Sequence, residues 1–152
     1  MRTILRTLES QGSIEKATFG AGQISSNLSR ARKDLLTAKA TVTADAEWAY
    51  TIAYHAMLRA GRALMFSLGF RPKGKDQHKT VAEFCTAVLG EEYKNLTARF
   101  NRMRVKRHDF IYEPERPIPR SEAAKSIESA ERFVKEISAK ISRARPQEKL
   151  FP

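Results

Sequence analysis

Residues 46 to about 68 have helical periodicity and are apolar around most of the helix circumference. One stripe is almost entirely alanine, which would let a neighbouring helix approach closely: Ala46, Ala49, Ala53, Ala56, Ala60 and Ala63. A second stripe is bulky: Tyr50, Tyr54, Met57, Gly61, Leu64 and Leu68. The third mixes polar and aromatic side chains: Trp48, Ile52, His55, Arg59, Arg62 and Phe66. Such a segment predicts the central helix of a bundle.

Four further segments predict the helices that surround it. Thr43 or Asp45 is the expected N-cap of the central helix, and Gly90 is the expected end of a short helix that follows it. A helix with an arginine-rich end is expected from about residue 91 to residue 108 or slightly beyond. The first of the other three helices has the inward positions Ile24, Leu28, Ala31, Leu35, Ala38 and Val42. The short helix before Gly90 has Val81, Phe84, Cys85 and Val88 inward. The last helix follows Ser121 as its expected cap and has the inward positions Ala124, Ile127, Ala130, Val134, Ile137 and Ile141.

The sequence shows no strand-like alternation, so the predicted fold class is all-α, an up-and-down bundle of about five helices. Residues 1–22 are weakly patterned and predict a flexible arm or one short helix. Residues 23–143 predict the helical bundle, interrupted by an extended connection at Pro114, Pro117 and Pro119. Residues 144–152 predict a loose tail.

The formal net charge of +11 predicts attraction to polyanions such as RNA, DNA, an acidic membrane surface or an acidic protein. An inert basic surface is the alternative. Cys85 is the only cysteine, which excludes an intramolecular disulfide and fits a reducing, cytoplasmic setting. The dispersed histidines and the absence of a glycine-rich phosphate loop predict no metal and no cofactor. No signal peptide is apparent, and His55, Arg59 and Arg62 interrupt the longest apolar region, so no membrane span is expected.

Residues 99–107 contain five positive charges and no acid, and His108 follows directly. If this stretch is helical, one face carries an apolar stripe made of Leu96, Phe100, Met103 and Phe110. Arg107 occupies a gap in this stripe and therefore points inward. Arginine is almost never fully buried unless it is paired. We therefore expect Arg107 either to bind an anion or to form a structural ion pair with Glu113 or an acid on the central helix.

Three local motifs together resemble the HEPN family of small all-α domains. They are residues 53–64 of the central helix; the turn at residues 69–72 with His78 opening the next helix; and the arginine-rich helix end. The resemblance covers roughly Ala21 to Arg143. It implies relationship to RNA-cleaving toxins and to partners of minimal nucleotidyltransferases, and a homodimer in which this helix packs against its copy.

The family hallmark is an arginine followed, after four to six residues, by a histidine. Arg102 and His108 satisfy that spacing, but six residues correspond to about 600° of helix rotation, which separates the side chains. The second placement starts at Arg107, with His108 at the polar position and Tyr112 in place of the terminal histidine. We favour the second placement, in a groove shared by two subunits.

The resemblance implies metal-independent RNA cleavage in which the ribose 2′-hydroxyl attacks the neighbouring phosphate. We therefore predict a toxin-like component of a toxin–antitoxin pair acting on RNA. Arg102 and Arg107 would hold phosphate, His108 would transfer protons, and Tyr112 would position the substrate. Further contacts to nucleic acid are expected from Arg99, Arg104, Lys106, Arg59, Arg62, Arg71 and Lys73.

Two other functions fit the same residues. One is a non-catalytic module that binds a nucleotide or nucleic acid and docks a nucleotidyltransferase, which the replacement of the terminal histidine by Tyr112 favours. The other is a basic bundle that only dimerises. For His55 and His78 a structural role is favoured, with His55 as a hydrogen-bonding residue. For His108 the alternative to catalysis is a role as a helix cap.

Overall fold

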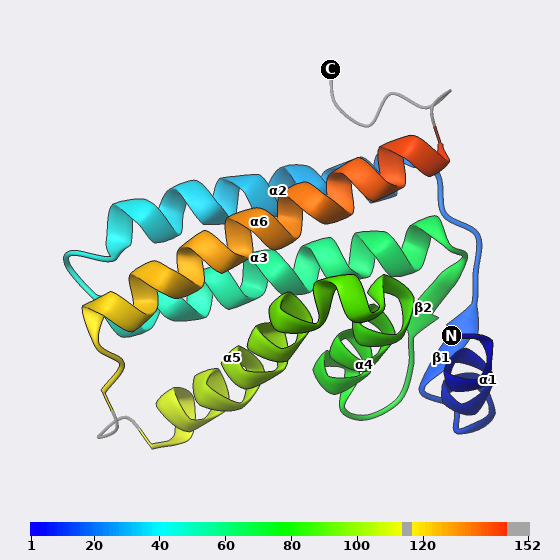
Figure 1. The fold of residues 1–152 in the computed structure, drawn as a ribbon, viewed down its shortest axis with the longest axis horizontal. Coiled ribbons are helices and arrows are strands. Elements are labelled where there is room, and N and C mark those ends of the chain that lie inside the picture. Colours follow the sequence, from blue (N-terminus) through cyan, green and yellow to red (C-terminus); the bar gives the residue numbers. More distant parts are fainter. Residues whose placement is uncertain (114–116, 146–152) are drawn as a thin grey trace.

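Three long helices each pack against the other two and form a bundle (Figure 1). They are α2 (Ala21–Thr41), α3 (Ala46–Ser67) and α6 (Arg120–Ala144). Two further helices, α4 (Gln77–Leu89) and α5 (Lys94–Tyr112), pack against α3 and against each other. A single turn of 3₁₀ helix, Glu91–Tyr93, joins them. The computed structural model describes residues 1–113 and 117–145, and within them the fold is all-α apart from one small sheet.

The predicted central helix is α3, which contacts α2, α4, α5 and α6. Ala49, Ala53, Ala56, Ala60 and Ala63 are all fully buried, which confirms the small-residue stripe against which neighbouring helices pack. Of the two predicted caps, Asp45 is the one used: its side chain accepts a hydrogen bond from the backbone N–H of Trp48 at 2.9 Å. This bond satisfies one of the free N–H groups of the first turn.

The helix α4 packs closely against α3 at Gly61. A β-carbon built at Gly61 would lie 2.6 Å from Cγ1 of Val81 and 3.1 Å from Sγ of Cys85. The absence of a side chain therefore sets how tightly α4 packs on α3. Gly90 ends α4 as predicted, with a φ of 76° that favours glycine.

The N-terminal segment forms a sixth helix, α1 (Arg2–Ser10), and a strand, β1 (Ile14–Lys16). This strand pairs antiparallel with β2 (Phe70–Pro72), with Ile14 opposite Pro72 and Lys16 opposite Phe70. The sequence analysis did not predict a sheet, because strands of three residues are too short to show a period of two. The division into an arm, a bundle and a tail stays a prediction, and residues 146–152 lie outside the described residues.

The start of α6 differs from the prediction in two details. Ser121 is not the cap: the helix begins at Arg120, and Pro119 in extended conformation (ψ 149°) occupies the N-cap position. Ala124 is exposed, whereas Ala123 is fully buried. The apolar stripe with steps of four and three therefore continues back from Ile127 to Ala123. No helix in the described part of the chain has the length and hydropathy needed to cross a membrane.

Candidate functional site

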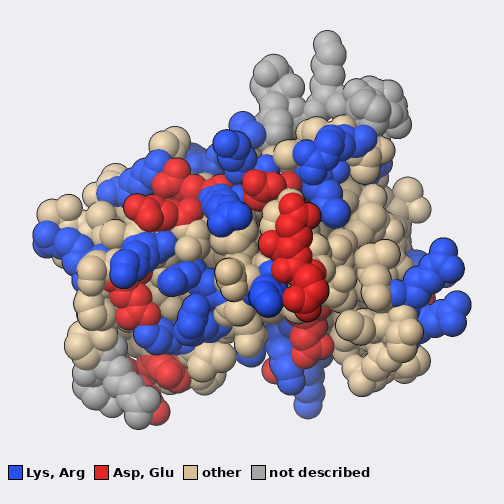
Figure 2. Space-filling model, viewed as in Figure 1, with Lys and Arg blue, Asp and Glu red and all other residues tan. Residues whose placement is uncertain are grey.

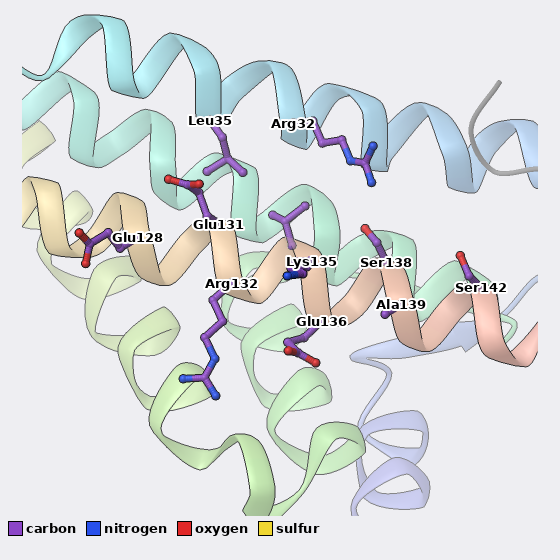
Figure 3. A pocket seen from close by; sticks show the side chains of 11 residues that line it. Arg32, Leu35, Glu128, Glu131, Arg132, Lys135, Glu136, Ser138, Ala139 and Ser142 are labelled. Atoms are coloured by element: carbon purple, nitrogen blue, oxygen red, sulfur yellow. The ribbon is translucent and has the colours of Figure 1, made fainter.

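One cavity, of about 860 Å³, runs between α2 and α6 (Figure 3). Figure 3 shows Arg32 and Leu35 on α2, across from the side chains of α6. Three basic and three acidic side chains line this cavity, so its charges balance: Arg32, Arg132 and Lys135 against Glu128, Glu131 and Glu136. None of the residues predicted to act on RNA lines it. This cavity therefore offers little attraction to a polyanion.

A second cavity, of about 580 Å³, lies between the start of α4 and the last turns of α5, and we call it the basic cavity. Its lining carries three cations and two imidazoles against a single acid: Lys79, Arg104, Arg107, His78 and His108, with Asp76. The remaining lining residues are Gln77 and Val105. The N-terminus of α4 adds the positive end of a helix dipole. This is the cavity that best suits a phosphate group.

Arg107 points inward, as its place in the apolar stripe predicted. Its guanidinium carbon lies 6.0 Å from the ring centroid of Tyr54, a residue that is fully buried on α3. The Nε of Arg107 is buried and has no hydrogen-bond acceptor among residues 1–113 and 117–145. A buried guanidinium N–H without an acceptor costs free energy. A bound anion that accepts a hydrogen bond from this N–H would therefore stabilise the protein.

Tyr54, His55 and His78 form a cluster behind Arg107. The hydroxyl of Tyr54 and Nδ1 of His78 share a hydrogen bond of 3.0 Å, and the His55 ring lies 6.2 Å from that of His78. Burial raises the pKa of Tyr54 to about 12, so the hydroxyl keeps its proton at neutral pH. Burial, and next the charge of Arg107, lower the pKa of His78 to about 4, so its imidazole is neutral at pH 7.

The sequence favours a structural role for His55 and His78, and the structure places both beside Arg107. His78 also lines the basic cavity. The only sequence signal was the place of His78 at the start of a helix after a glycine- and proline-containing turn. That signal does not show which distant helix the imidazole will meet.

The residues of the two motif placements are separated by the structure. Arg107 and His108 both line the basic cavity. Arg102 is exposed on α5, and neither it nor Tyr112 lines this cavity. Tyr112 is 71% exposed, and its ring packs on His108 with 4.6 Å between the centroids. The catalytic roles of these four residues stay predictions.

Two of the predicted nucleic-acid contacts flank the site. Arg104 lines the basic cavity, where the side-chain oxygen of Asn101 accepts hydrogen bonds from its guanidinium at 3.0 and 3.1 Å. Arg62 is half-buried, and its charge helps to lower the pKa of His78. Burial lowers the pKa of Arg62 itself.

The other predicted contacts lie elsewhere or have acidic partners. Arg59 forms an ion pair with Asp34 at 2.9 Å, and Lys106 forms one with Glu122 on α6. In the sheet region Arg71 and Lys73 both pair with Glu15 of β1, and Arg99 is half-buried on α5. The contacts of these residues with nucleic acid stay predictions, but the structure does not gather the residues around the basic cavity.

The described residues contain no group of three or more His, Cys, Asp or Glu side chains that could hold a metal ion. Cys85 is fully buried against α3, and burial raises the pKa of its thiol to about 12. The thiol therefore stays protonated at neutral pH and is a poor nucleophile.

Comparison with known families decides the relationship. The sequence model of the HEPN domain matches residues 24–141, which is most of the chain. The protein belongs to the HEPN domain family. The comparison with curated proteins finds no match. The matched HEPN segment runs from the first turns of α2 to the last turn of α6, and it includes every residue that lines the basic cavity. The resemblance inferred from the sequence and the all-α fold are thus confirmed.

Proposed function

We propose that this HEPN protein is the toxin-like component of a toxin–antitoxin pair and cleaves RNA without a metal ion. The observation that supports this most directly is the guanidinium of Arg107. It is partly buried, its Nε lacks an acceptor among the described residues, and it lies in a cavity with an excess of positive charge. Such a guanidinium suits a phosphodiester, whose oxygens accept hydrogen bonds from arginine.

The residues of the basic cavity fit an internal transfer reaction. The ribose 2′-oxygen attacks the adjacent phosphorus and the bond to the 5′-oxygen breaks, which leaves a cyclic phosphate and a 5′-hydroxyl. A proton must leave the 2′-hydroxyl and another must reach the 5′-oxygen, and His108 is the imidazole of the motif that would carry them. Arg107 and Arg104 would stabilise the negative charge on the phosphorane oxygens.

A homodimer would complete the groove. Val105 and Tyr112 are seven residues apart on α5, lie on the same helix face and are 46% and 71% exposed. His108 lies between them on this face. A second copy packed against α5 would cover these apolar side chains and bring a second basic cavity close to the first.

Cleavage of labelled single-stranded RNA by the pure protein in the presence of EDTA tests the proposal. Arg107→Ala should lower the cleavage rate about 100- to 1,000-fold, the usual effect of removing one donor that stabilises a transition-state oxyanion. Arg102→Ala should lower the cleavage rate less than Arg107→Ala does, because Arg102 does not line the basic cavity. Arg132→Ala, in the charge-balanced cavity on α6, is the matched control. Equal cleavage by wild type and Arg107→Ala would refute the proposal.

The second candidate function is a non-catalytic module that binds a nucleotide or RNA and docks a nucleotidyltransferase antitoxin. The exposure of Tyr112 favours it, because this tyrosine replaces the terminal histidine of the hallmark and lies outside the basic cavity. Salt-sensitive RNA binding without cleavage, together with co-purification of a nucleotidyltransferase, would support this function over the first.

A further inference from the structure

A third cavity, of about 300 Å³, lies on the other side of Arg107 from the basic cavity, and we call it the aromatic cavity. Residues of α2, α3 and α5 line it: Asp34, Trp48, Thr51, Ile52, His55, Arg59, Arg107 and Ile111. Among the described residues, Arg107 is the one that lines both this cavity and the basic cavity. Whatever Arg107 binds is therefore adjacent to both.

Trp48 gives the aromatic cavity an exposed ring surface. Its side chain lies at the start of α3 and is 49% exposed, while the ring of Phe110 supports it at a centroid distance of 6.5 Å. Ile52 and Ile111 provide apolar walls beside it. An exposed indole next to a cation is the combination with which proteins stack the bases of single-stranded nucleic acid.

The polar groups of the aromatic cavity suit the edge of a heterocycle better than a second phosphate. Asp34 is buried, and Arg59 and Arg30 pair with it at 2.9 and 3.2 Å, so the guanidinium of Arg59 already has a carboxylate partner. His55 is half-buried and contacts two aromatic rings but makes no hydrogen bond within the described residues. Burial lowers the pKa of His55, so the imidazole is neutral and offers one donor and one acceptor.

We infer that the aromatic cavity binds one base of single-stranded RNA, stacked on Trp48, while an adjacent phosphate binds Arg107. This inference rests on the proposed RNA-binding function, because Arg107 must hold the strand for a base to reach Trp48. The volume is at the lower end of the range for small-molecule pockets, roughly 300 to 1,000 Å³, which suits a single ring system. Arg59 already pairs with Asp34, so Arg107 is the cation among the described lining residues that is open to an anion, and the apolar walls favour a ring over an acidic peptide.

Fluorescence of the wild-type protein provides a direct test, because Trp48 is the only tryptophan in the chain. The probe is a short 2′-O-methyl oligoribonucleotide, which lacks the free 2′-hydroxyl and resists cleavage. The control probe has the same length and backbone charge but carries no bases. The probe with bases should quench the fluorescence of Trp48, whereas the probe without bases should bind more weakly and leave the fluorescence unchanged.

Substitution of Trp48 tests the same contact by affinity. Trp48→Ala should weaken binding of the probe with bases about 5- to 150-fold, the effect of losing one base–aromatic stack, and should leave binding of the base-free probe unchanged. Trp48→Phe should retain most of the affinity. Leu68→Ala, an exposed apolar residue just after the other end of α3, should behave like wild type.

The possible failures are distinct. If RNA binds with salt-sensitive affinity but neither quenches Trp48 nor responds to Trp48→Ala, the base pocket is refuted and the proposed function stands. If neither probe binds, the proposed function fails first. If acrylamide cannot quench Trp48 in the free protein, a second copy covers this surface, and the base pocket is likewise refuted.

Discussion

His78 is a neutral imidazole among cations, and this arrangement couples its protonation to the anion that binds next to it. Burial has the largest effect on its pKa, and the charges of Arg107 and Arg62 come next. A phosphate in the basic cavity would offset those charges. Its arrival should therefore raise the pKa of His78 from about 4 towards the ordinary histidine value.

The same residue should make stability depend on pH. An ordinary histidine has a pKa near 6.5, so between pH 6.5 and about 4 the unfolded chain binds a proton at His78 before the folded protein does. The free energy of unfolding should therefore fall as the pH falls through this window. The free energy of unfolding of His78→Gln should fall less steeply, because glutamine does not bind a proton. The carboxylates titrate in both proteins, so their effect cancels in the difference between the two. The half-exposed ring reduces the effect below that of the full shift.

Urea unfolding of wild type and His78→Gln at several pH values between 4 and 7 measures this difference. A pH-independent difference would show that the pKa of His78 is similar in the folded and unfolded protein. Imidazole NMR signals recorded with and without the 2′-O-methyl probe would report the expected rise on binding.

The residues of the site were predictable to different degrees. The inward direction of Arg107 followed from its place in a local apolar stripe, since helix periodicity alone fixes which face a residue occupies. The cluster of Tyr54, His55 and His78 was not predictable. Its members come from α3 and α4, and their distance depends on how the two helices cross, which no local pattern contains.

At the scale of helices, the crossing of α3 and α4 depends on Gly61. The side chains of Val81 and Cys85 occupy the space that a β-carbon would need there. This contact fixes the position of α4, and the first residues of α4 line the basic cavity. A change at Gly61 should therefore affect both stability and the site.

Gly61→Ala should lower the free energy of unfolding by up to about 2 kcal/mol. Overpacking of a buried contact costs roughly 1 to 3 kcal/mol, and the better helix propensity of alanine offsets up to about 1 kcal/mol of it. Gly22→Ala in the first turn of α2 is the matched control, because its β-carbon would meet nothing within 4 Å. Urea denaturation compares the two, and equal effects would contradict the role given to Gly61.

The sequence predicted the five bundle helices because each carries a long stripe of apolar residues, as α2 and α3 show. The sheet and the start of α6 were missed for different physical reasons. The pairing of β1 with β2 depends on backbone hydrogen bonds between distant segments, which leave no pattern in the side chains. Ser121 has the preferred chemistry of an N-cap. Pro119, however, fixes the backbone so that the helix already begins at Arg120.

For the whole molecule, the formal net charge of +11 overstates the surface open to a polyanion. On the face shown in Figure 2, Asp and Glu lie among Lys and Arg over the left and central parts of the surface. Several cations also pair with acids on other elements, such as Lys39 with Glu131 at 3.0 Å. The basic cavity is thus a local excess of charge, with Lys79, Arg104 and Arg107 opposed only by Asp76 among its lining residues.

A local excess predicts a moderate salt dependence of RNA binding. If three cations each neutralise a phosphate of a single strand, log Kd should rise by about 2 for a tenfold increase in salt. Lys79→Ala should reduce this slope by about 0.7, and Lys39→Ala should leave it unchanged, because Lys39 does not line the basic cavity. Filter binding across a salt series measures the slopes. A much steeper slope would show that RNA follows the whole basic surface.

The pairing of Ile14 with Pro72 also imposes an order on folding during synthesis. When the ribosome has delivered α2 and α3, these two helices can form a hairpin from neighbours in the sequence, but β1 still has no partner. The strand finds its partner only after residue 72 has left the exit tunnel. The segment that contains β1, although made before α2 and α3, therefore reaches its final position only after both of these helices have been made.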